Sequence, residues 1–187
     1  MEIEIINMNP KNTNSVIVRN DGKVYAFDPW GSADDWNGMG VEAAFATHGH
    51  FDHISALAGW DVPWFMSGAD LPVLEWSNMI LESPVLTRPA DLSDSPKIGD
   101  MRIIKTPGHS AGSVCFYFPS AKTLVSGDTI FYDCVGRTDL PTGNAEQLRQ
   151  SIALLKNYGF PGDTLVIPGH GRSGTWGEIA KANPLLR

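Results

Sequence analysis

The histidines of this chain are few and unevenly placed, and they are the residues most suited to chemistry. The 187 residues include five histidines. Three of them fall in the run THGHFDH at positions 48, 50 and 53, together with Asp52, while His109 and His170 each end a Pro-Gly-His tripeptide. Neutral imidazoles and carboxylates bind zinc, iron and related divalent metals, so this pattern predicts a metal centre.

The spacing of these residues favours two metal ions over one. Alternate side chains of an extended segment point the same way, which pairs His48 with His50. Asp52 and His53 follow at the turn into an expected helix and therefore point elsewhere. Seven side chains are candidate ligands: His48, His50, Asp52, His53, His109, Asp128 and His170. Seven groups exceed the four ligands of a tetrahedral ion, so we expect two ions that share a carboxylate.

Short apolar runs stand directly before the candidate ligands and predict the strands that position them. Four such runs each end beside a ligand-bearing turn: 41–46, 101–105, 123–125 and 164–167. Ligand sites gather at the carboxyl ends of strands in α/β sheets, because loops can converge there without disturbing the core. We therefore expect these four turns to meet at one place.

The remaining segments predict further strands, helices and loops. Further strands are expected at residues 2–6, 15–19 and 23–27, the last two joined by an Asn-Asp-Gly turn typical of a hairpin. Helices are expected at residues 52–58, 68–76, 144–158 and 176–182, with Asn144 capping the third. Irregular segments are expected at residues 7–14, 32–40 and 83–96. The length suits a single domain over residues 1–187.

Composition excludes several classes of function. The formal net charge is −7 and no basic run is present, which argues against a nucleic-acid partner. No apolar stretch approaches the roughly 20 residues of a membrane helix. The amino-terminal segment does not resemble a signal peptide, and the two cysteines form no CxxC motif. We therefore expect a cytoplasmic protein without a membrane partner.

The order of the motifs resembles one known family. The run THGHFDH matches an HxHxDH signature, and TPGHSAGS, SGDTIF and PGHG follow it along the chain. This series resembles the metallo-β-lactamase superfamily, and with the earlier NSVIV and VYAFDP segments the resemblance covers nearly the whole chain. It implies an α/β fold, a four-layer αββα sandwich of two mixed β-sheets, with metals at one edge of the sheets.

The resemblance also implies a role for each candidate ligand. One metal would be held by His48, His50 and His109, the other by Asp52, His53 and His170, with Asp128 bridging them. The two divalent ions are expected to be zinc, with iron or manganese as alternatives. A metal-bound hydroxide would attack a carbonyl carbon, and Asp52 would orient that hydroxide and accept its proton.

Two further features resemble one branch of the superfamily. The segment GRTDLPTG at residues 136–143 and the closing segment are similar to small hydroxyacylglutathione hydrolases, the glyoxalase II-like enzymes, which implies a small acyl-thioester substrate. Asp128 stands where true zinc β-lactamases have cysteine, which disfavours antibiotic hydrolysis. We expect no long C-terminal helical domain of the kind that carries glutathione contacts in longer hydrolases, so the thiol of the substrate stays open.

Other functions remain possible from the sequence. Persulfide dioxygenases resemble the same pattern and bind one iron through the equivalents of His48, His109 and Asp128. A lactonase and a non-catalytic metal-binding domain are weaker alternatives. The GRTDLPTG segment and the complete set for a second metal favour the hydrolase.

Three residues near the expected site each have two alternative roles. Arg137 could meet a substrate carboxylate or pair with Asp139. Tyr132 could line the substrate pocket or pack in the core. Asp28 could support a metal ligand from behind or serve only a turn. The sequence marks no subunit interface, so the oligomeric state stays open.

Overall fold

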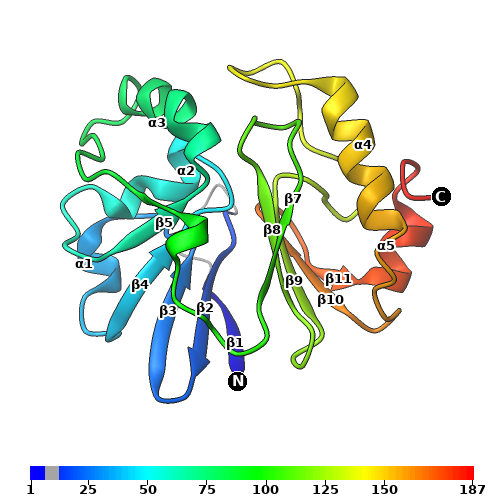
Figure 1. The fold of residues 1–187 in the computed structure, drawn as a ribbon, viewed down its shortest axis with the longest axis horizontal. Helices are drawn as coiled ribbons and strands as arrows, with labels where there is room; N and C mark the ends of the chain where they lie inside the picture. The colour runs from blue at the N-terminus through cyan, green and yellow to red at the C-terminus, as the bar shows by residue number, and fades with distance from the viewer. Residues whose placement is uncertain (7–12) are drawn as a thin grey trace.

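The computed structural model describes residues 1–6 and 13–187, which form two facing β-sheets with helices on the outer side of each (Figure 1). In spatial order, the first sheet contains β1 (Glu2–Ile6), β2 (Ser15–Asn20), β3 (Lys23–Phe27), β4 (Val41–Phe45), β5 (Trp64–Met66) and β6 (Ala90–Asp91). The second contains β11 (Gly174–Thr175), β10 (Leu165–Pro168), β9 (Thr123–Gly127), β8 (Val114–Phe118) and β7 (Arg102–Lys105). Both sheets combine parallel and antiparallel pairs.

The helices form the two outer layers. The first sheet is covered by α1 (Ala33–Trp36), α2 (Phe51–Ile54) and α3 (Leu71–Asn78), and the second by α4 (Ala145–Lys156) and α5 (Trp176–Ala182) (Figure 1). Short 3-10 turns are η1 (Ser55–Leu57), η2 (Gly68–Asp70) and η3 (Leu92–Asp94). None of the helices in the described ranges is long and apolar enough to cross a membrane.

The strands are apolar on both faces because each sheet lies between two layers. In β2, Val16 and Val18 point into the core between the sheets, whereas Ile17 packs into the core under the helices of the first sheet. In β8, Phe116 belongs to the central core and Tyr117 to the core shared with α4 and α5. This three-part core confirms the predicted αββα sandwich of two mixed sheets.

Most predicted elements are present, with ends that differ by one to a few residues. The strands at Glu2–Ile6 and Lys23–Phe27 and the helix at Trp176–Ala182 have the predicted bounds. The helix α4 begins after Asn144, whose side chain accepts hydrogen bonds from the amides of Glu146 and Gln147. The two helices predicted for residues 52–58 and 68–76 each divide into a 3-10 turn and an α-helix.

Some predictions were wrong or incomplete. Residues 32–40 were expected to be a loop, yet α1 forms there, because Ser32 and Asp35 make a reciprocal capping box and Trp36 is buried. The segment 83–96, expected to be irregular, contains β6 and η3, and the short strands β5 and β11 were not predicted. The expected loop at residues 7–14 lies outside the described residues except for its last two.

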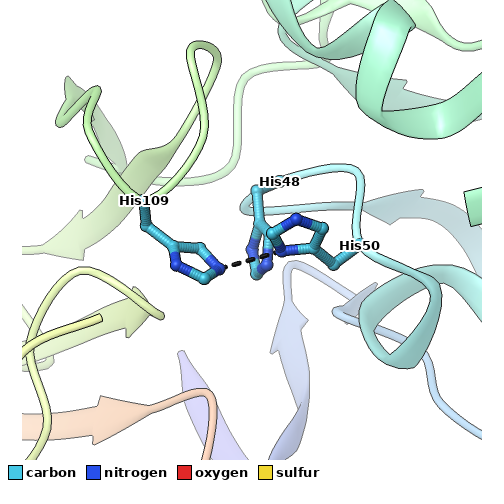
Figure 2. Close-up of side chains that lie close together, drawn as sticks. All are labelled: His48, His50 and His109. Atoms are coloured by element: carbon cyan, nitrogen blue, oxygen red, sulfur yellow. Dashed lines mark hydrogen bonds between the residues drawn. The ribbon is translucent and has the colours of Figure 1, made fainter. Parts of the chain in front are cut away.

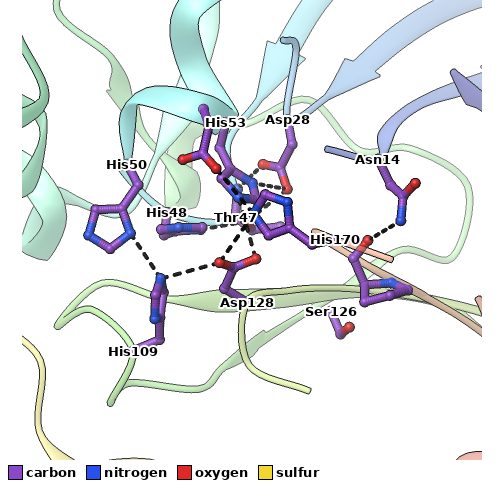
Figure 3. Close-up of polar contacts among 12 residues, drawn as sticks. Asn14, Asp28, Thr47, His48, His50, His53, His109, Ser126, Asp128 and His170 are labelled. Atoms are coloured by element: carbon purple, nitrogen blue, oxygen red, sulfur yellow. Dashed lines mark hydrogen bonds and ion pairs between the residues drawn. The ribbon is translucent and has the colours of Figure 1, made fainter. Parts of the chain in front are cut away.

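The turns after β3, β4, β7, β9 and β10 converge at one edge of the two sheets, as expected from the carboxyl-end rule (Figure 3). These turns, together with α2 directly after the turn of β4, carry all of the candidate ligands and Asp28. The two sheets are joined at this edge by the amide of Val114, which donates to the carbonyl of Thr47 over 2.9 Å. The fold therefore presents the candidate ligands from both sheets to a shared space.

Candidate metal centre

Three imidazoles, those of His48, His50 and His109, converge from the two sheets (Figure 2). One nitrogen from each ring lies within 4.8 Å of the others, and Nδ1 of His50 is 2.9 Å from Nε2 of His109. All three residues are at most 3% exposed. We call this set the histidine group.

A second set, Asp52, His53 and His170, also brings its ligand atoms within 4.8 Å of one another. Nε2 of His170 lies 3.1 Å from Oδ2 of Asp52, and the two side chains are 30% and 21% exposed. We call this set the mixed group. It is more open than the histidine group, although His53 itself is fully buried.

Asp128 lies between the two groups (Figure 3). Its Oδ1 is 3.4 Å from Nε2 of His53, and its Oδ2 is 3.5 Å from Nε2 of both His109 and His170. One carboxylate thus faces ligands from both groups. All seven predicted ligands are brought together in this space.

Unpartnered nitrogen atoms show that the site suits a cation. Nε2 of His48 and Nε2 of His50 are buried, and among the described residues no hydrogen-bond partner meets either atom. Buried polar atoms without a partner are rare in folded proteins and require an explanation. Imidazole nitrogens aimed into a cluster of five histidines and two carboxylates fit zinc, iron or manganese.

The electrostatics of the histidine group favour neutral ligands. Burial, reinforced by the neighbouring histidines, lowers the pKa of His48 well below its usual range. Burial and His109 lower the pKa of His50 to about 4. Both rings are therefore neutral at physiological pH, which is the form that donates a lone pair to a metal.

The mixed group and Asp128 have the opposite electrostatic character. Burial acts to lower the pKa of His53, but Asp28, Asp128 and Asp52 outweigh it and raise that pKa well above its usual range. In the same way, Asp128 and Asp52 overcome burial and raise the pKa of His170 to about 9. A cation entering this group would displace those protons, because metal ligands must be deprotonated.

Asp28 supports the site from behind. Its Oδ2 lies 3.0 Å from Nδ1 of His53, which leaves Nε2 of that ring directed toward Asp128. Its carboxylate also accepts hydrogen bonds from the amide and hydroxyl of Thr47, over 2.7 and 2.8 Å. The contact with His53 is the one expected of a residue that orients a metal ligand, and Asp28 also occupies a turn with φ of 49°.

Arg137 contacts the site mainly through its main chain. Its carbonyl lies 2.8 Å from Nδ1 of His109 and fixes that ring with Nε2 toward the other ligands. Its guanidinium makes two hydrogen bonds to exposed Asp139, over 2.6 and 2.7 Å. The structure therefore shows the ion pair between Arg137 and Asp139, which was one of the two alternative roles expected for Arg137.

A cavity of about 390 Å³ opens onto the ligands. Apolar side chains form much of its wall: Phe51, Trp76, Phe131 and Leu140. Arg137 lines it as well, whereas Tyr132 lines a neighbouring hollow that also touches His170. The ring of Tyr132 lies under the guanidinium of Arg172, 3.4 Å from ring centre to Cζ. Tyr132 is thus beside the ligand cavity and not among its lining residues.

Comparison with known proteins identifies the family. The model of the metallo-beta-lactamase superfamily matches residues 8–170, which include every candidate ligand. The chain belongs to the metallo-β-lactamase superfamily.

Relatives within this superfamily cover most of the chain. A probable metallo-hydrolase, YqgX of Bacillus subtilis, is 36% identical over 184 residues, covering 87% of this chain and 86% of the relative. The solved structure of TTHA1623 in a di-iron-bound form is 30% identical, with a TM-score of 0.85 over 98% of this chain and all of the other. BLEG-1, described as a B3 metallo-beta-lactamase, is 32% identical, with a TM-score of 0.81 over 99% of both chains.

Several residues that hold the candidate metal centre together were not predicted from the sequence. The side-chain amide of Asn14 donates to the carbonyls of Pro168 and Gly171, on either side of His170. Buried Asp70 and Ser77 contact the loop between His48 and His50. In the sequence, Asp70 stands before Leu-Pro near the start of a predicted helix, a pattern that indicates an ordinary helix cap. Only its burial in the structure indicates that its carboxylate has a role beyond capping.

Proposed function

We propose that this metallo-hydrolase homologue is a dinuclear enzyme that hydrolyses a small acyl thioester. The observation that carries the proposal is that the histidine group, the mixed group and Asp128 gather beside one cavity, which five of these seven side chains line. Two sets of ligands with a carboxylate between them suit a pair of ions. When bound, such ions polarise a carbonyl group and lower the pKa of water.

Asp52 is the residue we assign to proton transfer. Its carboxylate lines the cavity and is 21% exposed, so one oxygen can face a water molecule there. Burial raises the pKa of Asp52, but His53 and His170 together overcome this and lower it, which keeps the carboxylate ionised. An ionised carboxylate can orient water toward a carbonyl carbon and accept its proton.

The walls of the cavity support a thioester substrate. The lining residues Phe51, Trp76, Phe131 and Leu140 offer apolar surface to an acyl chain and to sulfur. Leu140 belongs to the GRTDLPTG segment that resembles glyoxalase II-like hydrolases. Thiolate is a good leaving group, so hydrolysis needs no separate strong acid. Zinc is the proposed metal, and the di-iron form of TTHA1623 supports iron as the alternative.

Metal analysis and S-lactoylglutathione hydrolysis on one purified sample test the proposal. We expect close to two ions per chain, and hydrolysis that falls by about a hundredfold or more in Asp52→Asn, the range typical of a lost general base. Asp61→Asn, an exposed carboxylate away from the cavity, is the matched control and should leave hydrolysis unchanged. A fully loaded protein that hydrolyses none of a panel of thioesters would contradict the thioester assignment.

A mononuclear iron dioxygenase is the second candidate. Oδ2 of Asp128 lies 3.5 Å from Nε2 of His109, and the ring of His48 lies close to both of these side chains. Two histidines and one carboxylate are therefore available to a single iron. One tightly held iron per chain, with oxygen uptake on glutathione persulfide, would favour this function. A β-lactam is assayed beside the thioester panel, because the similar protein BLEG-1 is described as a β-lactamase.

A further inference from the structure

The carboxylate of Asp70 is fully buried between two ligand-bearing loops that come from different sheets. We propose that Asp70 is a positioning residue that holds these loops so that the histidine group can bind its metal. The inference rests on the metal centre of the proposed function, but it does not depend on the identity of the substrate.

Three donors from the two loops meet this carboxylate. Oδ2 accepts from the amide of Gly49 over 2.8 Å and from the hydroxyl of Ser110 over 2.7 Å. Oδ1 accepts from the amide of Gly112 over 2.6 Å. Gly49 lies between His48 and His50, and Ser110 directly follows His109. Asp70 is thus bonded next to each member of the histidine group.

The two loops are joined by Asp70 and by the amide of Val114, which donates to the carbonyl of Thr47. The first follows β4 in one sheet, and the second joins β7 to β8 in the other. A buried carboxylate with charge-assisted hydrogen bonds to both loops ties them together more strongly than neutral groups would. The result is visible in the rings, since His50 and His109 approach to 2.9 Å between nitrogens (Figure 2).

Helix α3 anchors the carboxylate. Asp70 is the N-cap of this helix, a position where an aspartate side chain usually accepts from the helix's own amides. It makes no such bond, and its oxygens are turned to the loops instead. At the other end of α3, the hydroxyl of Ser77 donates to the carbonyl of Gly49 over 2.8 Å. One short helix therefore holds both the amide and the carbonyl of Gly49.

The close fit at Asp70 requires glycine on the facing loop. A Cβ on Gly112 would lie 2.7 Å from the amide nitrogen of Asp70 and 2.8 Å from its Oδ1. A side chain there would push the loop that carries His109 away from Asp70. Asp70 gives the mixed group no such link, because none of the hydrogen bonds described for Asp70 reaches the turns of Asp52, His53 or His170.

The test measures zinc affinity by competition with a chromophoric chelator, on the full chain freed of metal. Asp70→Asn is made in two backgrounds, His170→Ala, which keeps the histidine group, and His50→Ala, which keeps the mixed group. We expect zinc affinity to fall about ten- to a hundredfold in the first background, the usual cost of losing a residue that orients a ligand, and to stay within about threefold in the second. The cobalt absorption spectrum should change only in the first.

Leu155→Ala is the matched control for general loss of stability. Leu155 is fully buried in the core between the second sheet and α4, away from the ligands. It should lower the melting temperature without the selective loss of affinity. Equal weakening in both backgrounds, or a selective loss that Leu155→Ala reproduces, would overturn the assignment. If the wild-type chain binds two ions but hydrolyses no thioester, the proposed substrate fails and the Asp70 result still stands on its own.

Discussion

The histidine group and the mixed group are adjacent, yet the protein builds them differently. The histidine group is assembled from two sheets, burial lowers the pKa of His48 and of His50, and its three residues are at most 3% exposed. The mixed group combines a carboxylate with two imidazoles, and the side chains of Asp52 and His170 are 21% and 30% exposed. We therefore expect the closed group to retain its metal more firmly than the open group does.

Removing one ligand from each group gives the largest expected effect. His48→Ala should lower zinc affinity at the histidine group by more than about a hundredfold. Mutation of a residue that only orients a metal ligand already lowers metal affinity about ten- to a hundredfold, and loss of the ligand itself should cost more. His170→Ala should leave one firmly held ion. Metal content after dialysis against a weak chelator measures both. If the His170→Ala chain loses both ions together, the two groups are not independent.

Asp28→Asn tests the support behind the mixed group. The variant keeps the size of the side chain but loses the charge beside Nδ1 of His53. We expect about a tenfold loss of affinity at the mixed group and a much smaller one at the histidine group. Asp34→Asn, on the exposed side of α1, is the control. If metal affinity is unchanged at both groups, Asp28 serves only the turn and does not support a metal ligand.

Gly169→Ala tests how tightly the mixed group is packed against Asp128. A Cβ on Gly169 would collide with Oδ1 of Asp128 and lie 2.6 Å from Cε1 of His53. We expect the metal-free chain to lose about 1–3 kcal/mol of unfolding free energy, the usual cost of overpacking. Denaturant unfolding measures it. Gly162→Ala, which would meet nothing within 4 Å, should change stability by less than about 0.5 kcal/mol.

Arg137→Gln should have the smallest effect. The carbonyl that holds His109 is retained, and the lost ion pair with Asp139 is exposed, a kind of pair that contributes little. We expect metal affinity to be unchanged and KM for the thioester to rise by less than about threefold. Steady-state kinetics on the metal-loaded chain measure this. A large rise in KM alone would show that the guanidinium binds substrate after all.

The strands and the main helix could be predicted because their signals are local. Short apolar runs and the Asn144 cap depend on neighbouring residues, and the structure has these elements at nearly the predicted bounds. The helix at Ala33–Trp36 was missed because burial of Trp36 stabilises a segment whose composition is typical of a loop. The strands β5, β6 and β11 contain only two or three residues, which is too few to show periodicity. They are stabilised by pairing with neighbouring strands in the sheets.

By itself, the sequence determined which residues could hold metal, since five histidines and two carboxylates stand at strand ends in recognisable motifs. The resemblance implied how these ligands divide between two ions, and the tertiary structure decided which set is closed, which is open, and which residues hold them in place. Asn14 and Asp70 look like an ordinary loop residue and an ordinary helix cap along the chain. Their roles arise from hydrogen bonds across 21 to 157 positions, a separation at which no local pattern in the sequence carries information.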